Sequence, residues 1–322
     1  MIRTQLLLPL FPLALLLSCP MQKAQERKEG QAGGPKGNPD YVRLVVPPQG
    51  KGHLDTALVT FRDGKGRTLD LVGAVHLGEK SYYQALNLLF TKYDALLYEL
   101  IAPRDHRPPN RRRGGNLLSM IQGAMGDKLG LAFQLDEIDY GKANFVHADL
   151  TPKKFARKWK EKGGFLKLFL RTLALQGELN KRNDPEDSMK MMIALLTSSK
   201  PDYLRFLFAK QMRDMDLLNL LLDGKDGALI GARNAAALKA LRRQLAAGHK
   251  RLGLFYGAAH MGDMEERLEQ ELGFVKVRTR WLRAWSFTLT PPQRKAFREK
   301  QPPREAPEKK EGAAGKEKDG GR

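Results

Sequence analysis

The sequence predicts a mixed α/β protein, in which a mixed sheet is built from two strand–helix units with a largely helical insertion between them. Three observations indicate this fold class. Apolar strand-like runs recur at both ends of the chain's central region, two of these runs end in the same Gly-x-x-His-x-Gly motif, and the residues between them have helical apolar spacing. Strands that alternate with helices are typical of a sheet covered by helices. A chain of 322 residues is long enough to bury such a core.

The first residues resemble a bacterial lipoprotein signal. Residues 1–19 place Arg3 before an apolar stretch that contains Pro9 and Pro12. This stretch is shorter than the roughly 20 residues that a spanning helix needs, and its prolines disfavour such a helix. The stretch ends in Leu-Leu-Ser-Cys, which resembles a lipobox with Cys19 as the lipidated residue. We therefore expect a lipid anchor in the cell envelope, on the periplasmic face or in the outer membrane. An ordinary signal peptide with an incidental cysteine is the alternative.

Two polar segments flank the folded part of the chain. Residues 20–40 are rich in Gly, Pro and Lys and predict a flexible tether. Residues 291–322 have few large apolar side chains, so they cannot bury enough surface to offset the entropy lost on ordering. We expect a disordered charged tail there and a folded domain over residues 41–290.

The domain is expected to open with a β-hairpin and a strand–helix–strand unit. Residues 55–62 and 68–75 are rich in Val, Leu and Thr, and the Asp-Gly-Lys-Gly segment between them is typical of a tight turn. Residues 81–92 repeat apolar side chains at helical spacing, and residues 95–101 form a short apolar run typical of a buried strand. The connection is long enough for the two later strands to be parallel.

The middle of the domain, about residues 112–225, is predicted to be mainly helical. Thr151 and Pro152 are the usual cap and first residue of a helix, and residues 144–150 before them read as a strand. The other segments with helical spacing are 116–125, 128–136, 165–175, 185–197 and 202–222.

The end of the domain returns to alternating helices and strands. Residues 229–247 predict a long helix that ends at Gly248. A buried strand over 251–257, a helix over 263–272 with Asp263 as its cap, and a closing strand over 274–282 follow.

The residues that could carry chemistry follow the buried strands. Gly73-Ala-Val-His76-Leu-Gly78 and Gly257-Ala-Ala-His260-Met-Gly262 repeat one motif, each at the carboxyl end of a strand. In open α/β sheets, ligands bind at that edge. Histidine there can act as a base, an acid or a metal ligand near neutral pH. A single such histidine is more often structural, but two copies favour a functional site.

Glu99 is a third polar residue at an equivalent position, late in an otherwise apolar strand. A buried carboxylate is costly unless it is paired or coordinated. Together with His76 and His260 it would complete a two-histidine, one-carboxylate set that suits a divalent metal such as Mn, Co or Zn.

Three further residues have a structural and a functional interpretation. His147 and Asp149 end another strand, where they could supply a further metal ligand, hydrogen-bond a ligand from behind, or simply cap the next helix. Arg233 begins the long helix and could hold Glu99, stabilise a substrate oxyanion, or form a surface ion pair. The sequence contains no Gly-x-Ser-x-Gly, HExxH or phosphate-loop motif, so no other catalytic class is favoured.

The net charge of +20 has several explanations. A basic excess can bind nucleic acid, an anionic membrane surface or nothing at all when it is a solvated face. No nucleic-acid motif is recognisable, so we do not expect nucleic acid as a partner.

At the strand-end motifs the sequence resembles the TraB/PrgY/GumN family, which includes the Tiki proteins. The segments that carry the resemblance are GAVHLG, YDALLYEL, GARN and GAAHMGDMEERLEQELGF. It implies a fold like that of the erythromycin esterase and haem-binding ChaN groups. It also implies a site made of His76, Glu99, Arg233 and His260, and the divalent-metal-dependent proteolysis attributed to Tiki members.

From the residues and the resemblance together we expect a metal-dependent hydrolase that acts on a peptide or protein substrate. One alternative is an envelope protein that binds a peptide or haem without catalysis, and another is a structural envelope protein with a decayed site. Whether the chain forms a homodimer is left open.

Overall fold

The computed structural model describes residues 41–103, 126–164, 167, 170, 201–213 and 227–299. These residues belong to two units, one within 1–288 and the other within 289–322. The proposed signal, tether and Cys19 lie outside the described residues, so the lipid anchor stays a prediction. The helices predicted over 116–125 and 185–197 also lie outside them, as do all of 165–175 except residues 167 and 170.

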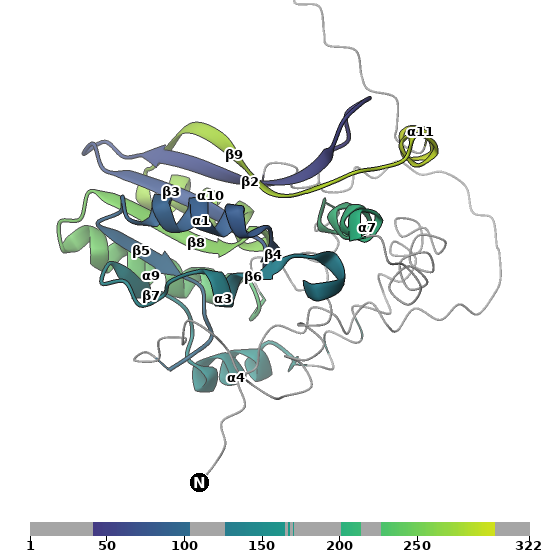
Figure 1. The fold of residues 1–322 in the computed structure, drawn as a ribbon. Coiled ribbons are helices and arrows are strands. Elements are labelled where there is room, and N and C mark those ends of the chain that lie inside the picture. Colours follow the sequence, from purple (N-terminus) through teal and green to yellow (C-terminus); the bar gives the residue numbers. More distant parts are fainter. Residues whose placement is uncertain are drawn as a thin grey trace, which may run out of the picture. The chain divides into compact units, whose positions relative to one another are not determined.

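The first unit contains a seven-stranded mixed sheet, which confirms the mixed α/β class (Figure 1). The strands follow the order β1-β2-β3-β8-β5-β7, and β9 pairs with the other side of β2. Their bounds are β1 Val42–Val45, β2 Gly52–Arg62, β3 Thr68–Ala74, β5 Ala95–Tyr98, β7 Phe145–His147, β8 Arg251–Gly257 and β9 Val275–Phe287.

The predicted hairpin is present as β2 and β3. Its turn forms because the Asp63 carboxylate accepts hydrogen bonds from the N–H groups of Lys65 and Arg67, both at 2.9 Å. Gly66 completes the turn at φ 75°, a backbone conformation that glycine adopts without strain. The antiparallel register from Leu58–Val72 to Arg62–Thr68 follows from this turn.

Four strands are parallel and end at one edge of the sheet. β3 pairs with β8, β8 with β5, and β5 with β7, all in parallel. The helix α1 (Lys80–Phe90) lies between β3 and β5 in the sequence. In the sheet, however, β8 lies between these two strands, although it follows them by more than 150 residues. Residues that follow β3, β5, β7 and β8 are therefore brought together from distant parts of the sequence.

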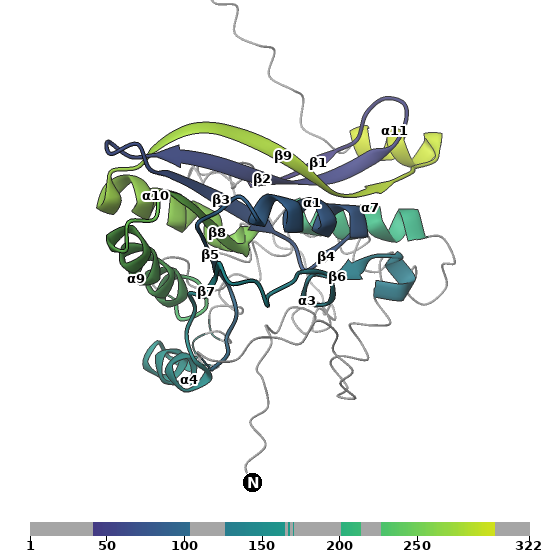
Figure 2. The ribbon, with the colours of Figure 1, turned by 60° about the vertical axis from the view of Figure 1, so that its left-hand side comes forward.

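Helices cover both faces of the parallel strands (Figure 2). On one face, Phe90 of α1 packs on Phe255 of β8 with their ring centroids 4.8 Å apart. On the other face lie α9 (Gly231–Ala246) and α10 (Met261–Leu272), and the side chain of Met261 approaches Gly73. Since both faces are covered, every residue of β5 is buried.

The insertion is less helical than predicted in its first described part. The continuous helix expected over 128–136 is interrupted, because a helical stretch ends at residue 129 and Gly130 turns the chain at φ 58°. β6 (Ala132–Phe133) then pairs with β4 (Leu77–Gly78), and the short α3 (Gln134–Glu137) follows.

The later part of the insertion agrees better with the sequence. α4 (Pro152–Glu161) begins after Thr151, whose side chain accepts a hydrogen bond from the Lys154 N–H at 3.4 Å. α7 (Pro201–Arg213) packs beside β9 and β1. Arg205 on α7 donates to the backbone oxygens of Leu129 and Ser286, at 2.6 and 3.1 Å.

Two predictions near the end of the chain need correction. Asp263 lies inside the first turn of α10 instead of capping it, because the helix already begins at Met261. In the second unit, α11 (Pro291–Glu299) is a helix where the sequence predicted a disordered tail from residue 291. Among the described residues, no helix has both the length and the apolar character needed to cross a membrane.

Candidate functional site

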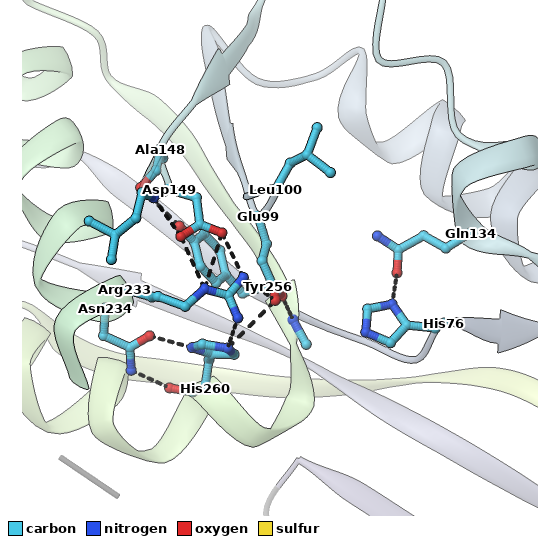
Figure 3. A network of polar contacts seen from close by, with 12 residues as sticks. His76, Glu99, Leu100, Gln134, Ala148, Asp149, Arg233, Asn234, Tyr256 and His260 are labelled. Atoms are coloured by element: carbon cyan, nitrogen blue, oxygen red, sulfur yellow. Dashed lines mark hydrogen bonds and ion pairs between the residues drawn. The ribbon is translucent and has the colours of Figure 1, made fainter. Parts of the chain in front are cut away.

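A cluster of charged side chains lies at the carboxyl edge of the parallel strands (Figure 3). Glu99 directly follows β5, Asp149 comes two residues after β7, and His260 lies in the short 3-10 turn (Ala258–His260) that follows β8. Arg233 reaches them from the first turn of α9. The parallel register explains the convergence, since neighbouring parallel strands end at the same level.

Arg233 joins the two carboxylates of this cluster. Its Nη2 atom donates to Glu99 Oε1 and to Asp149 Oδ2, both at 2.6 Å, and its Nε atom donates to Asp149 Oδ1 at 3.1 Å. The Arg233 side chain is 7% exposed and that of Asp149 is fully buried. This charge-assisted fork holds Arg233 in one geometry.

The charges of the cluster fix one another's protonation. Burial by itself would raise the pKa of Glu99, but the Arg233 guanidinium, followed by the two histidines of the repeated motif and the Gly257 N–H, holds it well below its ordinary value. Burial by itself would lower the pKa of Arg233, but Asp149 and Glu99 raise it above its ordinary range. Glu99 and Arg233 are therefore both charged at neutral pH.

His260 is held as a neutral imidazole. Its Nδ1 atom lies 2.6 Å from the Asn234 side-chain oxygen, and the Asn234 amide nitrogen donates to the His260 backbone oxygen and to Asp263 Oδ2 at 3.0 and 2.8 Å. These contacts assign the amide orientation, so Nδ1 carries the proton and Nε2 has a lone pair. Burial lowers the pKa of His260 to about 4.

The lone pair of His260 faces the charged groups. Its Nε2 atom lies 3.4 Å from Arg233 Nη1 and 3.6 Å from Glu99 Oε1. One nitrogen and one carboxylate oxygen thus converge, while Glu99 Oε2 accepts a hydrogen bond from the Gly257 N–H at 2.6 Å.

His76 does not join this cluster. Its side chain is exposed, and Nδ1 lies 3.2 Å from Gln134 Oε1. Gln134 also donates to the Tyr140 hydroxyl at 2.9 Å, which orients its amide so that Oε1 accepts from His76. Within the described part of the chain, no hydrogen bond or ion pair links His76 to Glu99 or His260, and Figure 3 shows the ring standing apart.

His147 and Asp149, the two residues expected to support the metal ligands, do not lie together. Asp149 belongs to the cluster, as described above, whereas His147 does not contact it. The His147 Nε2 atom lies 2.6 Å from the backbone oxygen of Leu100, and its ring packs edge-on against Tyr98. His147 therefore supports the chain just after Glu99.

The cluster fits a divalent metal ion in charge and donor type but not in ligand number. Arg233 is the only arginine or lysine that pairs with Glu99 or Asp149 among the described residues, and with His260 neutral the four residues have a formal charge of −1. His260 Nε2 and Glu99 Oε1 are donors that Zn²⁺ and Mn²⁺ accept. Over the residues that the structure describes, however, no group of three or more His, Cys, Asp or Glu side chains lies close enough to hold a metal.

Two residues that contact His260 were not identified from the sequence. Asn234 is completely buried and fixes His260, yet its only signal was its position beside Arg233 in the GARN segment. Tyr256, also buried, stacks edge-on against His260 at 5.3 Å and donates its hydroxyl to the Ala148 backbone oxygen at 2.9 Å. The sequence carries no signal for that contact, because Ala148 is over a hundred residues away.

No protein-family model matches this sequence, and no curated protein matches it. The resemblance to the TraB/PrgY/GumN family therefore stays a prediction that rests on the quoted motifs. The geometry described above is independent of that resemblance.

Proposed function

We propose that this protein is a hydrolase of the cell envelope that cleaves peptide bonds with a divalent metal ion held beside Glu99 and His260. Membership of the TraB/PrgY/GumN family, a ChaN-like fold and an anchor at Cys19 are parts of the same proposal. One observation carries it: the Nε2 lone pair of a neutral, buried histidine faces a carboxylate oxygen 3.6 Å away, inside a cluster with one excess negative charge.

The hydrogen bonds around His260 support a ligand role. Metal-bound histidines usually donate their other ring N–H to an oxygen acceptor, which fixes the tautomer and the ring orientation. The Asn234 oxygen is such an acceptor at 2.6 Å. His76 is the proposed third ligand, since its exposed ring lies at the end of the neighbouring strand β3.

Each residue of the site has a role in the proposed reaction. The metal, when bound, supplies Lewis-acid polarisation of the scissile carbonyl. Arg233 Nη1 donates one N–H to His260 Nε2, and among the described residues no carboxylate engages it, so its second N–H is left to stabilise an oxyanion. Asp149 keeps Arg233 oriented. If His76 is not a ligand, its exposed ring is the group that takes the proton of the attacking water and returns it to the leaving amine.

The experiment compares purified protein with His260→Ala and a matched control, His249→Ala. His249 lies just before β8, at the opposite end of that strand from His260. We expect about one Mn, Co or Zn per chain by elemental analysis. The metal should be lost in His260→Ala and retained in His249→Ala, and chelation should abolish cleavage of a peptide library. Metal content unaffected by His260→Ala would contradict the proposal.

A second candidate function is peptide or haem binding without catalysis. It is favoured by the fact that both oxygens of Glu99 already accept hydrogen bonds, from Arg233 and Gly257. Saturable binding of a peptide or haem that is insensitive to chelator, with no turnover, would support this candidate and contradict the hydrolase.

A further inference from the structure

Strand β9 has a long edge that no other strand pairs. Among the residues that the structure describes, β9 pairs with β2 alone. The end of β9 near residues 284–287 is occupied, because the Glu79 N–H donates to the Ala284 oxygen and the Glu79 carboxylate accepts from the Ser286 N–H. The rest of the strand, residues 275–283, is what we call the basic edge.

The alternation of β2 shows which backbone groups of the basic edge point outward. The Ala57 N–H donates to the Tyr41 oxygen, on the side of β2 away from β9. Its neighbours Thr56 and Leu58 therefore face β9, where their partners are Leu282 and Arg280. The N–H and C=O groups of Trp281, which lies between these partners, must therefore face the open side, and the same alternation places those of Thr279 and Arg283 there. These three residues form a template for another strand.

The side chains of this edge are basic and accessible. Every residue from 275 to 280 is exposed. Lys276 pairs with Glu265 at 3.0 Å, but no ion pair engages Arg278 or Arg280 within the described residues. Val275 and Val277 are also 68% and 51% exposed. On the other face of the strand, the Arg43 guanidinium lies 4.3 Å over the Trp281 ring.

We propose that the basic edge binds an extended acidic segment of a partner polypeptide, which adds a strand beside β9. Backbone hydrogen bonds to an edge strand give affinity, and flanking side chains select the sequence. Acidic residues opposite Arg278 and Arg280 would complete their charges, whereas a second copy of β9 would set arginines against arginines, which is unfavourable. This binding surface is separate from the charged cluster and does not depend on the hydrolase proposal.

Charged edge strands also occur simply as protection against aggregation, so the test must separate the two roles. The full chain is titrated against a fluorescent peptide of about ten residues that alternates Glu and Val. A peptide with Lys in place of Glu tests charge. The acidic peptide with N-methyl groups on the backbone nitrogens that face β9 tests the strand hydrogen bonds.

We expect the acidic peptide to bind and the other two to bind at least about tenfold more weakly. Arg278→Glu with Arg280→Glu should weaken binding about tenfold, unlike the charge-matched control Lys239→Glu with Arg243→Glu on the exposed face of α9. Thr279→Pro removes one outward N–H without touching the β2 ladder, so it should weaken binding relative to Thr279→Val.

Four results would overturn the proposal. The first is equal binding of the acidic peptide and its N-methylated form, and the second is equal weakening of binding by both pairs of charge reversals. The third is no binding of the acidic peptide to a chain whose circular dichroism is native. The fourth is self-association in sedimentation that Thr279→Pro abolishes, which would assign the edge to a second copy.

Discussion

The two copies of the Gly-x-x-His-x-Gly motif have different environments although their sequences are nearly the same. His260 is 3% exposed and contacts Asn234, Arg233 and Glu99, whereas His76 is exposed and contacts Gln134. The difference arises just after each histidine. At His260 the chain enters α10 at once, beside α9, while at His76 it first forms β4. The motif therefore places a histidine at the end of a strand. Whether that histidine is buried depends on the element that follows it, which is α10 after His260 and β4 after His76.

Replacing Arg233 would test the buried copy most severely. Arg233→Ala leaves the Glu99 and Asp149 carboxylates buried without their cation. We expect the free energy of unfolding in urea to fall by about 3 to 5 kcal/mol. Arg242→Ala, which breaks an exposed ion pair with Glu271, should cost no more than about 1 kcal/mol. Similar small losses in both variants would show that the cluster is not an electrostatic unit.

The buried copy should also give stability a characteristic pH dependence. His260 has a pKa of about 4 when folded and 6.5 as its reference value, so the unfolded chain binds the extra proton between these limits. The contribution of the neutral His260 side chain to the free energy of unfolding is complete above pH 6.5. It is lost as the pH falls toward 4, a change of about 3 kcal/mol. Burial lowers the pKa of His53 as well, so its effect has the same sign. Unfolding of the native chain and of His260→Gln, measured from pH 6.5 to 4.5, isolates the His260 part. Parallel curves would contradict this assignment.

Asn234 is predicted to set the state of the buried histidine. Asn234→Ala removes an acceptor from His260 Nδ1 and donors from the His260 oxygen and Asp263. We expect a loss of about 1 to 3 kcal/mol in thermal or urea unfolding, because buried polar groups lose their partners. Asn234→Asp keeps the acceptor and adds a negative charge, so it should raise the pKa of His260. A pKa unchanged in Asn234→Asp would show that the contact is absent in solution.

The smallest effect is expected at the exposed copy. His76→Ala removes one hydrogen bond to Gln134 from an exposed side chain. The free energy of unfolding should change by no more than about 0.5 kcal/mol. A loss as large as that of His260→Ala would mean that the two copies are equivalent after all.

Local sequence signals predicted six of the seven strands of the main sheet, all except β1, and most of the helices that the structure describes, because turn residues and apolar spacing act over short distances. The Asp63–Gly66 turn and the Thr151 cap are examples. The helix over 128–136 is interrupted because Gly130 turns the chain and because Phe133 pairs with Leu77, a contact that depends on a distant strand. In the site, the sequence indicated Glu99, Asp149, Arg233 and His260. Which of them touch was not predictable, since Arg233 and Asp149 are 84 residues apart. The same limit explains why Asn234 was missed.

The most direct test of this account is the protonation state of His260, measured by nitrogen-15 NMR of the imidazole ring. We predict a neutral ring at pH 6, protonated at Nδ1 by its contact with Asn234 and unprotonated at Nε2. Added Zn²⁺ should shift the Nε2 resonance and leave Nδ1 protonated. An imidazolium at pH 6, or a proton on Nε2, would contradict the claim that the buried copy presents a metal-binding lone pair to Glu99.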